Sequence, residues 1–366
     1  MNHSSSKFSP TAFINKIFPP PEFLRMPATG VDISDTKVRY IDFGYKNEER
    51  VIKLFGEEKI PEGVISSGYI NKPEELVKIL SNIKEKTGIS FVRASLPEEK
   101  AYLFQVQIPK LTDSELYEAV GFRLEENVPV SAKEAVYDFM VLDYGESKSD
   151  HLDVIVSVIP SKVSDAYADV FKKAGLIPLS FEISSQAIGR AVVNPKAQGS
   201  FLVMNFSETK TGFSIVSNGI VFFTSTVPFG SSALDEVLAK SAGLSIGELP
   251  DMKKEIIKDG KQDMKLFLEI MDAANPLKEE VKKLSAYWRT QSVKVLHKSS
   301  NIDKIILCGR DTAIPSVGEY IYATTGIKAE TANVWQNVFS FENYIPSIPR
   351  TDSLDYAGAI GLALIS

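Results

Sequence analysis

The hydrophobic pattern of the chain repeats itself after about 170 residues. Three short apolar stretches, each predicting a strand, lie at residues 30–33, 37–43 and 51–55. The same pattern returns at residues 201–206, 211–217 and 220–227. Asn218-Gly219 predicts a two-residue hairpin turn within the second set, because both residue types tolerate a positive φ. A predicted helix at 73–86 follows the first set, so the repeat indicates two similar α/β lobes.

The segment between the two repeats has a pattern of its own. Thr112 and Glu115 form a capping box, and the apolar stripe after them predicts a helix that ends at Pro129. Further elements are predicted as strands at 135–142 and 152–159 and a helix at 162–174 that ends before Gly175. This order is typical of a small α+β domain of about 70 to 85 residues.

Later in the chain, the residues Leu277, Val281, Leu284 and Trp288 fall at helical spacing and predict the buried stripe of a helix that begins at Asn275-Pro276. An apolar strand at 304–307 and a helix at 313–325 follow. We therefore expect five segments: an N-terminal arm (1–28), the first part of lobe 1 (29–92), an inserted small domain (93–178), a return to lobe 1 (179–196) and lobe 2 (197–366), with a helical subdomain at about 236–302. The aromatic-rich arm either packs on its own domain or touches a membrane surface or a partner.

Composition narrows the class of protein. The 366 residues are 44% hydrophobic and 24% charged, as in soluble globular proteins, and the net charge of −6 argues against a nucleic-acid partner. A single cysteine, Cys308, excludes an internal disulfide framework, and three isolated histidines build no familiar zinc site with it. The sequence has no run of about 18 apolar residues, so a cytoplasmic protein is expected.

Candidate chemistry lies at the turns of the two repeats. In each, a strand carries one Asp or Asn and then small hydroxyl residues, at Asp32, Ser34 and Thr36 and again at Asn205, Ser207 and Thr209. Backbone N–H groups and hydroxyls at such turns form a place for an anion, although hydroxyl-rich turns also occur as simple local caps. A third turn, Gly309-Arg310, joins a strand to a predicted helix and is a natural place for a nucleotide.

The order and spacing of several motifs resemble one family over most of the chain. They are the stretch from Ile108 to Leu142, with Ile-Pro-Lys-Leu-Thr-Asp-Ser-Glu-Leu and Glu-Asn-Val-Pro-Val, then Lys173 to Pro178, Val227 to Gly230 and Tyr356 to Ala363. Together they resemble the PilM family of type IV pilus assembly proteins, relatives of the cell-division protein FtsA. The resemblance implies an α/β, actin-like (ribonuclease H-like) bilobed fold with duplicated lobes and an inserted FtsA-type small α+β domain.

The same resemblance implies ATP with Mg²⁺ between the lobes. The matching positions are Asp32, Ser34, Thr36 and Arg39 in the first phosphate motif, Asn205, Ser207, Thr209 and Thr211 in the second, and Gly309 and Arg310 in the adenosine motif. Asp32 would hold a hydrated Mg²⁺ indirectly. Serines stand where the family has glycines, Asn205 replaces an aspartate and Arg39 a lysine. Both ATP binding and a purely structural cleft therefore stay open, and turnover is expected to be weak or absent.

Two functions from different classes follow. A PilM-like scaffold would lie in the cytoplasm at the inner face of the cell membrane, only peripherally attached, and bind the N-terminal peptide of a PilN-like membrane protein near residues 116–137. Other pilus assembly components, a homo-oligomer or a filament are further expected partners. The alternative is a nucleotide-hydrolysing enzyme or sugar kinase, for which Glu182 is the best placed carboxylate, unless it caps the helix that follows.

Overall fold

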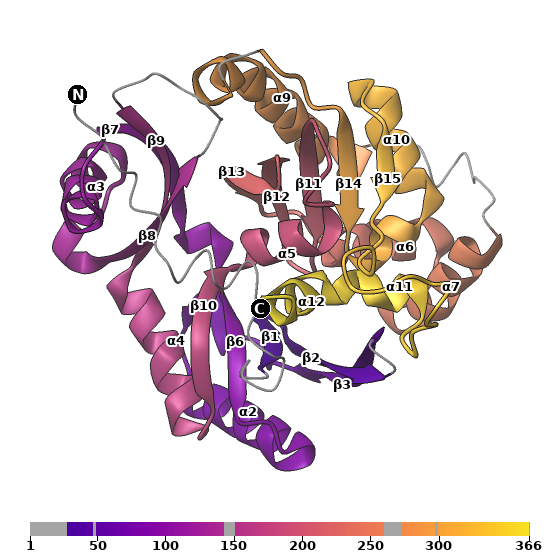
Figure 1. Cartoon of the computed structure of the whole chain (residues 1–366). Coiled ribbons are helices and arrows are strands. Elements are labelled where there is room, and N and C mark those ends of the chain that lie inside the picture. The colour runs from indigo at the N-terminus through magenta and orange to yellow at the C-terminus, as the bar shows by residue number, and fades with distance from the viewer. Residues whose placement is uncertain (1–27, 47–48, 143–150, 260–271, 297–298, 366) are drawn as a thin grey trace, which may run out of the picture.

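Lobe 1 is built on a five-stranded sheet at the bottom of Figure 1. The computed structural model describes residues 28–46, 49–142, 151–259, 272–296 and 299–365, so the expected arm lies outside it except for Ala28. The strand order is β10-β6-β1-β2-β3, with bounds Ile177–Ile183, Phe91–Leu96, Thr29–Ile33, Lys37–Lys46 and Glu49–Lys59. Helices α2 (Pro73–Thr87) and α4 (Ser161–Lys173) pack on it, and a short hairpin, β4 (Ile65–Ser66) and β5 (Tyr69–Ile70), precedes α2.

Lobe 2 repeats this design with the sheet order β13-β12-β11-β14-β15, whose strands span Ile220–Val227, Thr211–Ser217, Ser200–Phe206, Lys304–Cys308 and Ala329–Thr331. Asn218 and Gly219 have φ values of 50° and 76°, which confirms the predicted hairpin turn. The surrounding helices are α6 (Ser231–Ala242), α7 (Leu249–Asp259), α9 (Asn275–Val295) and α10 (Pro315–Thr325). The predicted stripe of α9 is buried, and Trp288 packs on Phe222.

The small domain lies beside both lobes, at the upper left of Figure 1. Its sheet has the order β7-β9-β8, with bounds Tyr102–Pro109, His151–Pro160 and Ala135–Leu142, and α3 (Asp113–Asn127) covers one face. The Thr112–Glu115 capping box is present at the start of α3.

Two boundaries of the small domain differ from the expectation. The expected start at residue 93 falls inside β6, which pairs with β1 and β10 of lobe 1. Helix α4 joins the lobe 1 core beside α2, because its buried side chains, among them Tyr167 and Phe171, face that sheet. We therefore assign residues 102–160 to the small domain.

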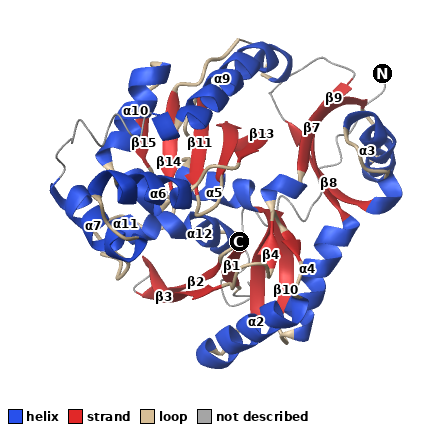
Figure 2. Cartoon of the chain, turned by 180° about the vertical axis from the view of Figure 1, so that it is seen from behind, coloured by secondary structure: helices blue, strands red, loops and turns tan. Residues whose placement is uncertain are grey.

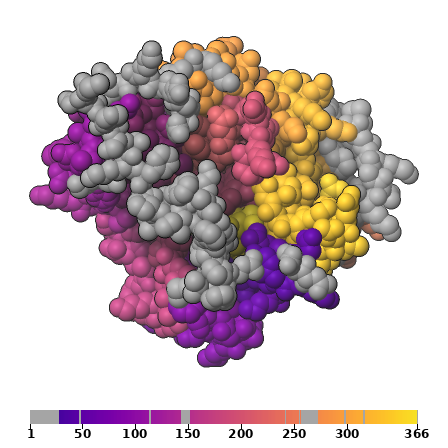
Figure 3. All heavy atoms as spheres, viewed as in Figure 1, coloured from indigo at the N-terminus to yellow at the C-terminus, as the bar shows by residue number. Residues whose placement is uncertain are grey.

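Two helices join the lobes, α5 (Ser184–Val192) and α12 (Ala357–Ala363). Figure 2 shows them between the two sheets, and Figure 3 shows the C-terminal residues in yellow against the first strands in indigo. The helices approach so closely that a Cβ on Gly361 would stand 2.9 Å from the Ala187 Cα atom. A mixed core of residues from α5, α12, β2 and lobe 2 surrounds the crossing. Small residues in α12 thus set how near the lobes come.

The third predicted nucleotide turn is built differently from the expectation. Helix α10 begins at Pro315, not near Ala313, and a 3-10 turn, η5 (Arg310–Ala313), connects it to β14. Proline suits the first position of a helix because its nitrogen has no hydrogen to leave unpaired. Among the helices that the structure describes, none is both long enough and apolar enough to cross a membrane.

Candidate interlobe cleft

A cleft with a volume of about 1040 Å³ lies between the lobes, where the two hairpin turns face η5. Eight of the ten residues predicted from the sequence line it: Asp32, Ser34, Thr36, Arg39, Asn205, Ser207, Thr209 and Arg310. Both turns stand at the β1–β2 and β11–β12 connections, because the repeated strand meander brings equivalent connections to the same side of each sheet. The duplicated pattern in the sequence therefore locates the cleft.

Two predicted residues do not line the cleft, which corrects their assignment. Thr211 is fully buried, and its hydroxyl donates a hydrogen bond of 2.6 Å to the carbonyl of Phe229. Gly309 has a φ of 95°, and a Cβ there would lie 2.9 Å from the carbonyl carbon of Phe206. Glycine is needed at this position for the close approach of η5 to the end of β11.

The two serines close their own turns in the same way. Ser34 donates from both N and Oγ to the carbonyl of Lys37, at 2.9 and 3.1 Å. Ser207 donates from N and Oγ to the carbonyl of Lys210, at 3.0 and 2.8 Å. Each hydroxyl is thus engaged as a local cap, the alternative that the sequence left open.

Asp32 stands at the floor of the cleft. Its carboxylate accepts a hydrogen bond of 3.5 Å from Ser184 and lies against Gly358, where a Cβ would come within 2.5 Å of Oδ2. Burial raises the pKa of Asp32 above its ordinary range, although hydrogen bonds from Ser95 and Ser184 and the charge of Arg39 act in the opposite direction.

The predicted cationic residues are already paired with carboxylates. Arg39 contacts Glu57 and Asp355, both at 3.2 Å. Arg310 lies 3.4 Å from Asp355, which also accepts the Arg310 backbone N–H at 2.8 Å. Asp355 therefore joins β2 of lobe 1 to the η5 turn of lobe 2. No sequence motif marked this residue, and its role depends on contacts between distant segments.

Two lysines of the cleft lining that had not been predicted pair with carboxylates of other segments, and one of them, Lys210, reaches lobe 1. Lys210 contacts Glu99 and lies 3.6 Å from Asp35. Lys253 of α7 contacts Asp235 of α6 and lies 3.0 Å from Asp311 of η5.

Glu98 is a buried acid in this network. It belongs to a 3-10 turn, η2 (Glu98–Lys100), between β6 and β7, and its carboxyl carbon would lie 2.8 Å from a Cβ on Gly212. Burial, aided by the negative charges of Glu99 and Asp32, raises the pKa of Glu98 to about 8, while Lys210 acts in the opposite direction. The carboxyl of Glu98 is consequently protonated at neutral pH.

In this conformation of the protein, the charges that line the cleft do not suit a nucleoside triphosphate. Ten carboxyl groups, Glu98 among them, and six cationic side chains line the cleft. Five of the cations, Lys37, Arg39, Lys210, Lys253 and Arg310, are in ion pairs with protein carboxylates. The volume is ample, but the cations that bind phosphate would first have to leave these partners. The residues present therefore do not fit ATP with Mg²⁺ without rearrangement.

Glu182 neither lines this cleft nor caps α5. It pairs with Arg190 in the last turn of α5, with one N–O distance of 2.7 Å, and Arg190 also donates to the carbonyl of Gly361 at 2.9 Å. The pair thus ties β10 and α5 to α12. This position corrects both readings of Glu182 from the sequence.

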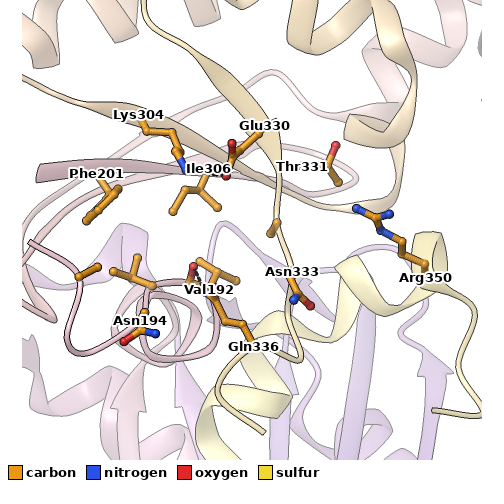
Figure 4. Close-up of a pocket in the computed structure, with 13 residues that line it drawn as sticks. Val192, Asn194, Phe201, Lys304, Ile306, Glu330, Thr331, Asn333, Gln336 and Arg350 are labelled. Carbon is orange, nitrogen blue, oxygen red and sulfur yellow. Dashed lines mark hydrogen bonds and ion pairs between the residues drawn. The ribbon is translucent and has the colours of Figure 1, made fainter. Parts of the chain in front are cut away.

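A second cavity, of about 610 Å³, lies on the other side of the α5 crossing. Figure 4 shows Phe201 and Arg350 at its two ends, with the Lys304–Glu330 ion pair on the strand side and Asn194 and Gln336 opposite. The C-terminal carbonyls of α5 beside it accept hydrogen bonds from the side chains of Gln336 and Asn337. Lobe 2 therefore holds the end of α5 by polar caps as well as by apolar packing, next to an unfilled space.

Two similar lobes, equivalent hairpin turns and the cleft between them define an actin-like protein. Among solved structures, MreB5 of Spiroplasma citri bound to ADP has this fold, with a TM-score of 0.52 and 11% identity over 91% of this chain and 94% of that chain. A structure described as the PilM-PilN type IV pilus biogenesis complex matches with a TM-score of 0.74 and 19% identity, over 93% of this chain and 98% of the matched one. The expected fold class is confirmed.

The chain belongs to the family of the type IV pilus assembly protein PilM, whose sequence model matches residues 30–366. The resemblance inferred from the motifs is thus confirmed over the whole length for which it was drawn.

Proposed function

We propose that this protein is a scaffold of the type IV pilus machinery that binds the N-terminal cytoplasmic peptide of a PilN-like membrane protein through its small domain, at the inner face of the cell membrane. Membership of the PilM family and the likeness to a PilM-PilN complex support this proposal. Nucleotide binding is not part of it, because the cations of the cleft are engaged by the protein's own carboxylates.

The surface that suits an extended peptide is the edge of the small domain at β8. Strand β7 contacts β13 of lobe 2, whereas β8, which also contacts α4, pairs with no strand other than β9 within the described part of the chain. A free strand edge binds an extended peptide through main-chain hydrogen bonds and side-chain contacts. Val136 and Met140, 49% and 44% exposed, point away from α3 and supply apolar contacts. The site thus begins within the expected region, 116–137, and extends beyond it along β8.

The observation that carries the proposal is the free edge of β8, with the exposed apolar side chains of Val136 and Met140 beside it. Gln105 lies on the same face but on β7, at the other edge of the sheet, and pairs in register with Ile155, which in turn pairs with Met140. Both polar atoms of its amide are buried and have no hydrogen-bond partner within the described residues. Neighbouring strands lie about 4.8 Å apart, so a peptide at the edge of β8 does not reach this amide.

Substitution of Met140 with arginine should weaken peptide binding at least tenfold, because a charge would enter the apolar contact. Fluorescence anisotropy with a labelled synthetic peptide, copied from the N-terminus of a PilN-like protein of the same organism, measures the affinity. The control is Tyr322→Arg, at an exposed aromatic residue on α10 of lobe 2. Unchanged peptide binding by Met140→Arg contradicts the β8 site. So does a result in which only Phe122→Arg, on α3, loses peptide binding.

Gln105→Leu serves as a control for the β8 site. Leucine removes the two unpaired polar atoms, so the free energy of unfolding should stay the same or rise by about 1 kcal/mol. Peptide affinity should not change, because Gln105 lies on β7 and not at the edge of β8. Urea unfolding and the same anisotropy titration measure the two quantities. A loss of affinity in this variant, with its stability kept, would show that the peptide binds on the β7 side of the sheet.

A further inference from the structure

The front of the interlobe cleft is crossed by one lysine with two carboxylate partners. Lys210 ends the hairpin turn of lobe 2, Asp35 lies in the equivalent turn of lobe 1, and Glu99 lies in η2, where the chain leaves β6 for the small domain. Their side chains are 18%, 14% and 13% exposed. Pairs so far removed from water are screened less by salt than surface pairs and hold a fixed geometry.

We propose that Lys210 is a latch that locks lobe 2 to lobe 1 and to the base of the small domain, so that the protein's own carboxylates, and not a bound polyphosphate, close this cleft. Glu99 and Asp35 supply Lys210 with the negative charge that an anionic ligand would otherwise bring. The inference concerns the closure of the molecule and goes beyond the proposed peptide site.

The packing around Lys210 explains why the latch bears on closure. Next to Glu99, the Glu98 side chain lies directly on Gly212 of β12, so η2 already touches lobe 2. Strand β13 also contacts η2. At the opposite side of the α5 crossing, polar caps and the 610 Å³ cavity leave the lobes less densely packed. The latch and the Arg39–Asp355 pair are therefore the charged contacts that join the lobes at the front.

Lys210 has no sequence motif, but it has an internal counterpart. The equivalent position in the first hairpin is Lys37, whose carbonyl closes its turn as that of Lys210 does. Lys37 pairs with Glu57 of its own sheet, at 3.3 Å, and makes no ion pair with lobe 2 among the described residues. The repeat thus places a lysine at each turn, and only the second reaches across the cleft.

Pulsed electron spin resonance between labels on the lobes tests the latch. Glu85→Cys on α2 and Glu236→Cys on α6 are exposed positions. Cys308 is fully buried, with the pKa of its thiol raised by burial to about 12, so it does not compete for the label. The labelled protein, with no nucleotide added, should show one narrow distance distribution. Lys210→Met and Glu99→Gln should each broaden that distribution and shift it to longer distances, whereas Lys240→Met, an exposed lysine of α6, should not.

The same measurement with added Mg-ATP tests whether a ligand closes the cleft. If the latch closes it, millimolar Mg-ATP leaves the distance distribution of the unsubstituted protein unchanged. A broad distribution that narrows only when Mg-ATP is added would overturn the proposal, because the ligand would then close the cleft. Unaltered narrow distributions in both Lys210→Met and Glu99→Gln would overturn it as well. Peptide affinity, measured separately, reports on the proposed function and is independent of these outcomes.

Discussion

Substitution of Gly361 with alanine is expected to lower the free energy of unfolding by about 3 kcal/mol or more. The new methyl group would overlap the backbone of Ala187 in α5, and backbone atoms cannot swing aside as a flexible side chain does. Helix α12 cannot retreat either. On its other side lies β1, where a Cβ on Gly30 would stand 2.7 Å from the nitrogen of Ala363.

A second helical glycine gives the matched control. In Gly318→Ala on α10, the nearest atom to the new methyl is Leu307 Cδ1, at an ordinary 3.6 Å. That variant should gain up to about 1 kcal/mol, because alanine favours helix over glycine. Urea unfolding of both variants measures the difference. Equal stability of Gly361→Ala and the unsubstituted protein would show that the α5–α12 crossing has space for a methyl group.

The stability of the protein should fall as the pH rises from about 4.5 to about 8, on account of Glu98. Its pKa is near 8 in the folded protein and 4.5 in the unfolded chain, so over this range the folded state holds a proton that the unfolded state has released. The contribution of Glu98 to the free energy of unfolding is full below pH 4.5 and is lost as the pH rises through the pKa of the folded state. The free energy of unfolding falls by up to about 1.4 kcal/mol per pH unit in this range.

Glu98→Gln removes this titration and keeps the size of the side chain. At pH 5 the variant and the unsubstituted protein should be about equally stable, and at pH 8.5 the variant should be more stable by several kcal/mol. Urea unfolding at four pH values measures both curves, with Glu85→Gln on the exposed face of α2 as control. Parallel curves for Glu98→Gln and the unsubstituted protein would show that Glu98 stays charged in the fold.

The repeated meander could be predicted from the sequence, because alternating strands and an Asn-Gly turn leave strong local signals. Strands 211–217 and 220–227 agree with the structure at both ends. A helix after Glu182 was expected and is present as α5, but helix α12 gave no such signal. Nearly all of its residues are buried, so it lacks the broad polar face that makes a periodic pattern. Strands β6 and β7 were not predicted, and the expected domain boundary at residue 93 falls inside β6.

The positions of the candidate site could be predicted better than its chemistry. Eight of ten residues line the cleft, since the turns were recognisable. The carboxylate that pairs with each cationic side chain lies far away in the sequence, as Asp355 does for Arg39 and Glu99 for Lys210. No local motif encodes such pairs. The peptide site has the same property, because the free edge of β8 is recognisable only once the strand order β7-β9-β8 is known.

The contact between β1 and α12 also constrains the order in which the protein is made. Lobe 1 opens with the first described strand and is completed by the last described helix, against which Gly30 packs. During synthesis from the N-terminus, lobe 1 stays without this helix until nearly all of lobe 2 has left the ribosome. Lobe 2, whose strands and helices are nearly consecutive, is complete earlier. The side of β1 that α12 covers therefore stays without its partner until the last stage of synthesis.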